Sequence, residues 1–190
     1  DYRTAEQKAE ALASAGGASS AATAAAPIEE DEAPVANAEP TTAVFAPVGG
    51  QVLSLADSGD KVFASGALGE GVAIVPNSGR IVSPVAGVLR TVAKTGHAFG
   101  IKTDDGVEVL VHVGIDTVSM DGEGFEVLVE KKQRVEVGDA LVNVDLAKVA
   151  SAGYATTTLM TVTNSKTMSA VTPIVDTVVN AGDPVIDIVR

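Results

Sequence analysis

The chain has 190 residues, with 25 acidic against 13 basic side chains, 46% apolar residues, two histidines and no cysteine. The formal charge of −12 argues against a nucleic-acid partner, because binding a phosphate backbone draws on clustered Lys and Arg. Without cysteine, the chain forms no disulfide, thiolate metal site or cysteine nucleophile. Neither a run of about 18 apolar residues nor a signal-peptide pattern occurs, so we expect a cytoplasmic domain without direct membrane insertion.

Residues 1–42 differ in composition from the rest of the chain. They contain 14 Ala, three Pro and the acidic cluster at 29–32, and they hold half of the formal charge. A segment with so few large apolar side chains cannot bury enough surface to offset the entropy of ordering. We therefore expect a flexible acidic linker over 1–42 and one folded domain over 43–190. Because the sequence opens on Asp1 rather than Met, we interpret it as the C-terminal piece of a longer polypeptide.

From residue 43 onward, short Val- and Ile-rich runs alternate with Gly, Asp, Asn and Pro. This texture predicts an all-β fold, an antiparallel sandwich or barrel with little helix. The expected strands lie at 51–55, 71–75, 87–92, 107–113, 140–144 and 184–189. One short helix is expected over 145–152.

Two pairs of segments repeat within the predicted domain. FAPVGGQV at 45–52 returns in outline as VSPVAGVL at 82–89, an offset of 37 residues. VEVGDAL at 135–141 returns as VNAGDPV at 179–185, an offset of 44 residues. Pro restricts one backbone angle and Gly frees another, so each Pro-Val-x-Gly segment is expected to turn a corner between strands. The repeats together predict a duplicated β unit.

Both histidines belong to one predicted hairpin. In the strand at 107–113, four valines alternate with Glu108, Leu110 and His112, which places His112 on the less apolar face. A four-residue loop over 103–106 would set His97 directly opposite His112, with Cβ atoms about 5 Å apart. A two-residue loop at 105–106 would instead set Phe99 opposite His112 and leave the histidines diagonal.

Two adjacent histidines can bind a metal, act as a general-base couple or accept a phosphoryl group. A zinc site needs a third protein ligand, and neither Cys nor a His-x-His pair is present, so we expect no resident metal and no cofactor. No G-x-S-x-G string supports a hydrolytic triad. A phosphoryl acceptor needs only a neutral imidazole, which apolar surroundings favour. Thr95, expected on the same face of an extended strand as His97, could supply a hydroxyl.

Several motifs in register resemble the glucose-family enzyme IIA of the bacterial phosphoenolpyruvate:sugar phosphotransferase system. The strongest are TGHAF at 95–99 and VLVHVGIDTV at 109–118. Others lie at 46–50, 62–64, 83–87, 122–125 and 137–139. The resemblance covers residues 44–190 and implies a compact antiparallel β-sandwich with a duplicated motif.

The resemblance also implies a reaction and its partners. His112 would be phosphorylated on Nε2 by the phosphohistidine of the small carrier protein HPr. His97 would orient and stabilise the phosphoryl group, with Thr95 in the same hydrogen-bond network. The group would then pass to a cysteine of enzyme IIB, for sugar phosphorylation coupled to uptake through the membrane domain IIC. On this interpretation the domain is a phosphotransferase component.

By the same resemblance, partner proteins would dock on an apolar patch with an acidic rim. The matching positions are Val62, Phe63 and Leu68 for the patch, and Asp60 and Asp116 for the rim that would attract Arg and Lys of HPr. Ala93 and Leu110 depart from the family pattern, because bulkier aromatic residues are common there in stand-alone proteins. The docking patch is therefore expected to be smaller.

Alternatives concern the setting and the class of protein. The long acidic segment favours a domain tethered to an inner-membrane permease over a stand-alone regulatory phosphocarrier. A lipoyl- or biotinyl-type carrier would need Lys at an exposed hairpin tip, where this chain has Asp104, Asp105 and Gly106. A zinc peptidase of related architecture would need the absent His-x-His pair.

Overall fold

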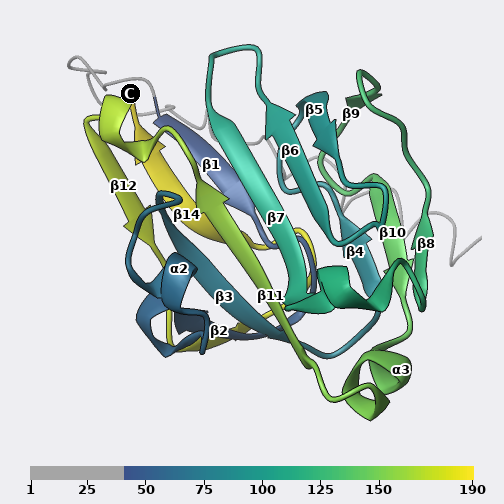
Figure 1. Cartoon of the computed structure of the whole chain (residues 1–190). Helices are drawn as coiled ribbons and strands as arrows, with labels where there is room; N and C mark the ends of the chain where they lie inside the picture. Colours follow the sequence, from purple (N-terminus) through teal and green to yellow (C-terminus); the bar gives the residue numbers. More distant parts are fainter. Residues whose placement is uncertain (1–40) are drawn as a thin grey trace, which may run out of the picture. The chain divides into compact units, whose positions relative to one another are not determined.

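The computed structural model describes residues 41–190, which form an antiparallel β structure (Figure 1). The strands are β1 (Thr41–Phe45), β2 (Gly50–Ser54), β3 (Glu70–Pro76), β4 (Arg80–Val82), β5 (Gly87–Val92), β6 (Ala98–Lys102), β7 (Glu108–Ile115), β8 (Phe125–Val127), β9 (Arg134–Val135), β10 (Ala140–Val144), β11 (Ala155–Val162), β12 (Ala170–Pro173), β13 (Thr177–Val179) and β14 (Pro184–Val189). The helical elements are α2 (Lys61–Ala64), α3 (Leu146–Ser151) and the 3-10 turns η1 (Leu55–Asp57), η2 (Thr117–Met120) and η3 (Ser165–Thr167). None of the helices in this part of the chain is long and apolar enough to cross a membrane.

The strands form three sheets. The largest has the order β13-β2-β3-β11-β7-β6-β5-β9, and the smaller ones have the orders β1-β14-β12 and β4-β10-β8. Every strand pair is antiparallel. The predicted fold class is therefore confirmed.

Each of the six predicted strands is present, with ends shifted by at most two residues. The predicted helix is α3, whose first turn is capped by the Asp145 carboxylate accepting from Lys148 N at 3.1 Å. Strand β1 begins at Thr41, two residues before the expected start of the domain at Ala43. The rest of the predicted linker, residues 1–40, lies outside the described residues. Helix α2 was not predicted from the sequence.

The internal repeats correspond to a structural duplication. Phe45 N–H donates to Pro84 O at 3.0 Å, and its counterpart Val82 N–H donates to Pro47 O at 2.8 Å. The pairing of β1 with β14 is repeated by β4 with β10, and the pairing of β2 with β13 by β5 with β9. The offset of 37 residues relates β1 and β2 to β4 and β5, and the offset of 44 residues relates β9 and β10 to β13 and β14.

The Pro-Val-x-Gly segments connect strands as expected, since one joins β1 to β2 and the other joins β4 to β5. Their glycines have a further reason to be conserved between the two copies. A Cβ on Gly50 would lie 1.9 Å from Val75 O, and a Cβ on Gly87 would lie 2.3 Å from Lys102 O. Only glycine allows the neighbouring strand to approach this closely.

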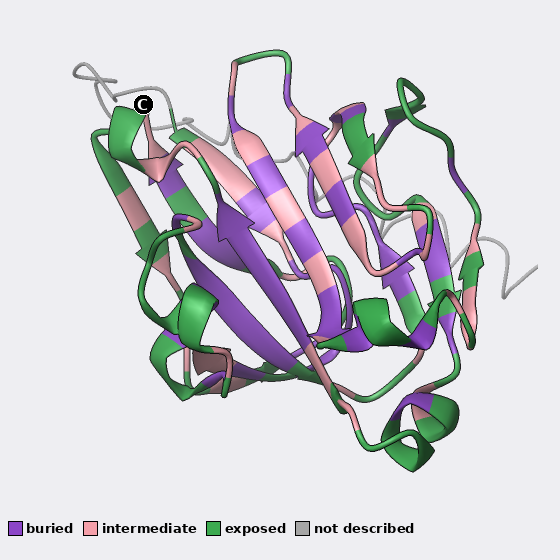
Figure 2. Cartoon of the chain, viewed as in Figure 1, coloured by how far each residue is buried: buried purple, intermediate pink, exposed green. Residues whose placement is uncertain are grey.

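The main core lies under one face of the largest sheet. The four valines of the strand at 107–113 are all buried there, while Glu108, Leu110 and His112 are partly exposed on the opposite face. Figure 2 shows this alternation as bands along β7. A smaller apolar cluster covers the His112 face and includes Leu55, Phe63, Ala73, Leu159 and, at its edge, Leu110.

Candidate functional site

The register of the β6–β7 hairpin differs from both predictions. Ala98, not His97 or Phe99, lies opposite His112. The connecting loop has three residues, 104–106: Gly106 N–H donates to Thr103 O at 3.1 Å, and Gly106 has φ 91°. A turn followed by a left-handed glycine is the usual three-residue hairpin loop, which the sequence interpretation did not consider.

The two histidines are nevertheless neighbours. Their ring centroids lie 5.2 Å apart, with the ring planes at 75°. His97 precedes the first residue of β6 and follows Gly96, which has φ 74°, so it does not follow the face alternation of the strand. Its carbonyl accepts from Val113 N at 2.6 Å, which fixes it beside β7. The expected adjacency is confirmed, although the expected register is wrong.

Thr95 contacts His97 as predicted. Thr95 Oγ1 and His97 Nδ1 lie 2.5 Å apart. The geometry behind the prediction was wrong, because Thr95 lies in a turn rather than in an extended strand. The turn at Gly96 brings the hydroxyl back to the ring. This contact occupies Nδ1 and leaves Nε2 of His97 for another group.

Gly114 is a functional position that the sequence interpretation missed. Its carbonyl oxygen lies 2.8 Å from His112 Nδ1. A carbonyl only accepts hydrogen bonds, so Nδ1 carries the proton in the neutral ring and Nε2 presents its lone pair. Gly114 has φ 76°, and a Cβ there would lie 2.3 Å from Thr117 Cγ2. The sequence shows a glycine at position 114, but it does not show in which direction the carbonyl of that glycine points.

Phe63, which was predicted as part of the apolar docking patch, packs against His112. Its side chain is only 4% exposed, and its ring packs edge-on against His112 with centroids 5.4 Å apart. Asp60 holds this aromatic in place by capping α2: Asp60 Oδ1 accepts from Val62 N at 2.8 Å and from Phe63 N at 3.2 Å. Phe63 is therefore a wall of the His112 site.

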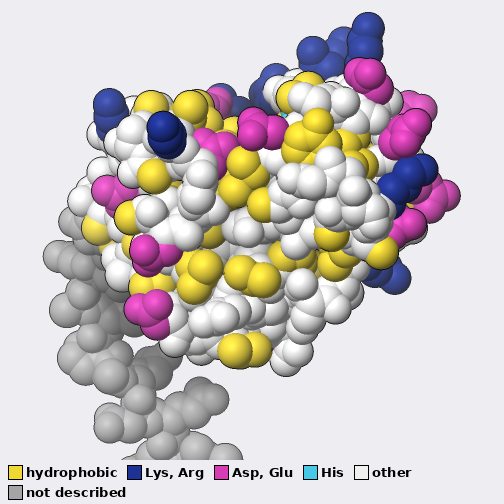
Figure 3. Space-filling model, turned by 60° about the horizontal axis from the view of Figure 1, so that its bottom comes forward, with side chains coloured by type: hydrophobic (Ala, Val, Ile, Leu, Met, Phe, Trp, Pro, Cys, Tyr) yellow, Lys and Arg dark blue, Asp and Glu magenta, His cyan; other side chains and the backbone are white. Residues whose placement is uncertain are grey.

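The other predicted docking residues lie around this wall. Val62 is 54% exposed, whereas Leu68 is partly buried against the smaller apolar cluster. Asp116 is exposed at the end of β7, followed by Val118, a 51% exposed side chain that the sequence interpretation did not include. Figure 3 shows hydrophobic side chains gathered on one face, with Asp and Glu side chains beside them.

The surroundings of both rings favour neutral imidazoles. Burial lowers the pKa of His112, partly opposed by the Gly114 carbonyl and by the charges of Asp60 and Asp116. Burial also lowers the pKa of His97, and the neighbouring His112 lowers it further. Near neutral pH, His112 therefore presents an uncharged nucleophilic nitrogen at a partly exposed surface.

Histidine and carboxylate side chains are also common metal ligands. Within residues 41–190, no three His, Asp or Glu side chains gather closely enough to hold a metal ion. The polar groups around His112 are the His97 imidazole, with the Thr95 hydroxyl on its Nδ1, and the carboxylates of Asp60 and Asp116.

Comparisons with known proteins show which proteins this chain is similar to. The chain is 42% identical over 147 residues to the beta-glucoside-specific EIIBCA component of Halalkalibacterium halodurans, covering 77% of this chain and 23% of that protein. It is 50% identical over 104 residues to the glucose-specific EIIA component of Staphylococcus aureus, covering 55% of this chain and 63% of that protein.

A solved structure, the glucose permease IIA from Mycoplasma capricolum, matches with a TM-score of 0.70 and 41% identity, over 78% of this chain and 96% of that one. The chain thus spans less than a quarter of the length of its fused relative. Residues 42–168 match the family described as phosphoenolpyruvate-dependent sugar phosphotransferase system, EIIA 1. The chain belongs to this EIIA family of the sugar phosphotransferase system.

Proposed function

We propose that this domain carries phosphoryl groups, accepting them from phospho-HPr on His112 Nε2 and passing them to a cysteine of enzyme IIB. The observation that carries the proposal is the contact of His112 Nδ1 with the Gly114 carbonyl at 2.8 Å, which leaves Nε2 as the free nucleophile. The family membership of the chain supports the same assignment. The activity is that of a phosphotransferase with a phosphohistidine intermediate.

In the accepting step, the lone pair of His112 Nε2 attacks phosphorus while the nitrogen–phosphorus bond of phospho-HPr breaks. The electron pair of that bond returns to the donor histidine, so the step needs no oxidant or reductant. Phe63, packed edge-on against His112, limits the approach of competing water from that side of the ring. A shallow, partly exposed site allows two different proteins in turn to place their reacting atoms in line with Nε2.

His97 acts on the phosphoryl group rather than as its carrier. When the Thr95 hydroxyl donates to His97 Nδ1, the proton of the neutral ring lies on Nε2. That N–H can donate to a phosphoryl oxygen on His112, because the two rings are adjacent. The added hydrogen bond stabilises the charge that the oxygens carry during transfer.

The next acceptor must lie outside this chain, because the chain contains no cysteine. Fused relatives whose printed names combine EIIA with EIIB and EIIC support a setting beside those domains. We infer that the residues before β1, 1–40, tether the domain on the cytoplasmic side of a permease, with IIB and the membrane domain IIC as its partners. A tether raises the effective concentration of the acceptor. The Staphylococcus aureus EIIA relative supports the second candidate, a stand-alone regulatory phosphocarrier.

Substitutions at the two histidines test the carrier function. We expect His112→Ala to take up no acid-labile, alkali-stable label from ³²P-phospho-HPr, because the nucleophilic nitrogen is absent. His97→Gln is expected to accept label but to slow transfer to enzyme IIB by about 100-fold, the scale of a lost stabilising donor. Labelling is read from gels after alkaline and acid treatment. Uptake of label by His112→Ala at the wild-type rate would disprove the assignment.

A further inference from the structure

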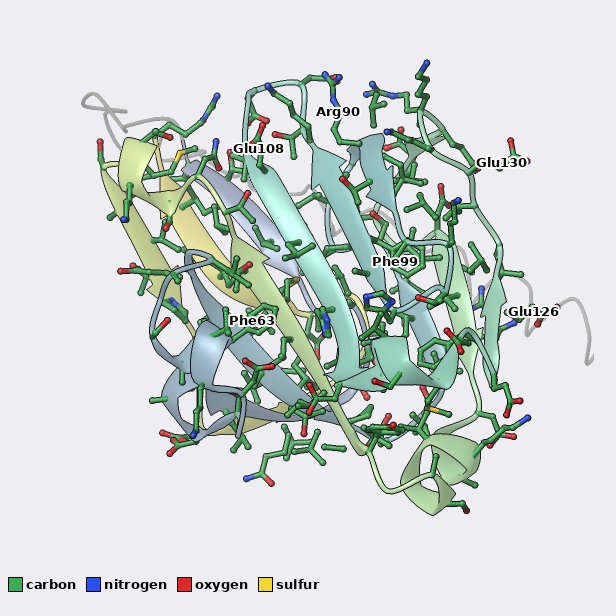
Figure 4. All side chains as sticks on the ribbon, viewed as in Figure 1. Phe63, Arg90, Phe99, Glu108, Glu126 and Glu130 are labelled. Carbon is green, nitrogen blue, oxygen red and sulfur yellow. The ribbon has the colours of Figure 1, made fainter. Side chains whose placement is uncertain are left out.

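A pocket lies on the His112 face of the largest sheet, toward the hairpin end of β6 and β7. Its volume is about 210 Å³, and its walls include Arg90, Thr91, Gly100, Lys102, Leu110 and Thr163. We call it the Gly100 pocket. Figure 4 shows Arg90 and Glu108 at this end of the strands, and Phe63 farther along.

The pocket is open because residue 100 has no side chain. Gly100 lies opposite Leu110 on β7 and opposite Thr91 on β5, in the middle of the three strands. A Cβ at this position would lie 3.2 Å from Thr91 Cβ, so any larger side chain would occupy the space. Gly100 does not have the positive φ that demands glycine elsewhere in this chain. Other residue types could therefore adopt the backbone conformation of Gly100. What glycine provides at this position is the open space of the pocket.

The pocket is continuous with the surroundings of His112. Leu110 forms one of its walls, lies two residues before His112 on the same face, and belongs to the apolar cluster that contains Phe63. Two residues along a strand span about 7 Å. A standard interface covers about 800 Å² on each protein, which corresponds to a circle of about 16 Å radius. Any protein that brings a phosphoryl group to His112 by such an interface therefore covers the pocket as well.

The two ends of this surface differ in charge. Asp60 and Asp116 act on His112 from one side. At the pocket, Lys102 pairs with Glu108 at 3.6 Å, whereas Arg90 is exposed and makes no ion pair within residues 41–190. Opposite charges at the two ends allow a partner to dock in one orientation and penalise the reverse one.

We propose that the Gly100 pocket receives an apolar side chain of the phosphoryl-donor protein, next to a carboxylate of that protein that pairs with Arg90. The pocket then fixes the orientation in which the donor reaches His112, while the acidic end receives basic side chains. Buried anchors in such pockets supply much of the binding energy of protein interfaces. The inference rests on the proposed function, whose donor is HPr.

Two variants test the pocket without touching the histidines. Gly100→Val fills it, and Arg90→Glu reverses the charge at its rim. Arg80→Glu on β4, in a different sheet, is the matched control with the same change of net charge. With ³²P-phospho-HPr as donor, we expect each pocket variant to lower kcat/KM by about tenfold through KM, the scale of one interface anchor. Arg80→Glu is expected to stay within about twofold of wild type, because Arg80 does not line the pocket.

The labelling results distinguish a failure of the pocket proposal from a failure of the phosphoryl-carrier function. Wild-type rates in both pocket variants would overturn the proposal, as would faster labelling of Arg90→Glu. Slowing of transfer to enzyme IIB alone would assign the pocket to the acceptor and also overturn it. If Gly100→Val does not fold, Arg90→Glu decides the matter by itself. No labelling of the wild-type protein would refute the proposed function first.

Discussion

At His112, one backbone contact decides which ring nitrogen can react. The Gly114 carbonyl holds the proton on Nδ1, and Phe63 shields the ring on one side. Burial keeps the pKa of both histidines below the ordinary value, which favours the uncharged nucleophile. Burial of the rings lowers the free energy of unfolding at acidic pH, because the same rings are protonated more readily in the unfolded chain.

We expect the free energy of unfolding to fall as the pH decreases from about 7 to about 5.5. Between the unfolded value of 6.5 and the lower native values, the unfolded chain binds more protons than the native protein, so protonation favours unfolding. Urea denaturation at both pH values measures the effect. A variant with His97→Gln and His112→Gln is expected to show a smaller decrease, because its carboxylates remain but both imidazoles are gone. An equal decrease in the variant would contradict the assignment to these rings.

At the scale of elements, the short helix α2 holds Phe63 against His112 and is capped by a predicted docking residue. Asp60 was predicted as part of an acidic rim, yet its carboxylate also caps the helix that holds Phe63 against His112. Sequence patterns could not show this role, because α2 has only four residues and no helical periodicity. The hairpin register escaped prediction for a related reason. A three-residue loop and a two- or four-residue loop use the same Asp and Gly residues, and a shift of one position changes every facing pair.

Two substitutions at Asp60 separate the cap from the charge. Asn caps helices about as well as Asp, whereas Ala costs about 1 kcal/mol. We expect Asp60→Ala to lower the free energy of unfolding by about 1 kcal/mol, and Asp60→Asn to leave it unchanged. Both variants should accept label from phospho-HPr more slowly at low salt, because both lose the negative charge. Equal destabilisation by the two substitutions, measured by urea denaturation, would show that the cap is not responsible.

At the scale of the whole domain, the duplication organises the fold. Equivalent aspartates, Asp139 and Asp183, close equivalent turns, each accepting from the backbone N–H three residues earlier at 2.8 Å. The proline carbonyl of each Pro-Val-x-Gly segment accepts a backbone hydrogen bond from the other repeat, from Phe45 N–H to Pro84 and from Val82 N–H to Pro47, so each copy fixes the corner of the other. Sequence offsets of 37 and 44 residues were sufficient to predict this duplication, because the turn residues recur in the same order.

The repeat glycines differ in what they tolerate. A Cβ on Gly87 would overlap Lys102 O in the adjacent strand, so we expect Gly87→Ala to lower the free energy of unfolding by more than about 3 kcal/mol. Gly138→Ala is the matched control, because its Cβ would meet nothing within 4 Å and only its φ of 91° is unfavourable. That cost is expected to be about 1 kcal/mol. Similar thermal stability of the two variants would contradict the close strand approach as the cause.

The strand pattern, the duplication and the valine face of β7 could be predicted from the sequence, because alternation and turn residues are local signals. The two histidines were also predicted to be neighbours, but from a hairpin register that the structure does not have. Tertiary structure decided the tautomer of His112, the burial of Phe63 and the opening at Gly100. Each of these features depends on segments that only folding brings together. They are the direction of the Gly114 carbonyl, the packing of the Phe63 ring from α2, and the space between β5, β6 and β7. The residues of the site can be predicted from the sequence, but their roles depend on the residues that surround them in the folded domain.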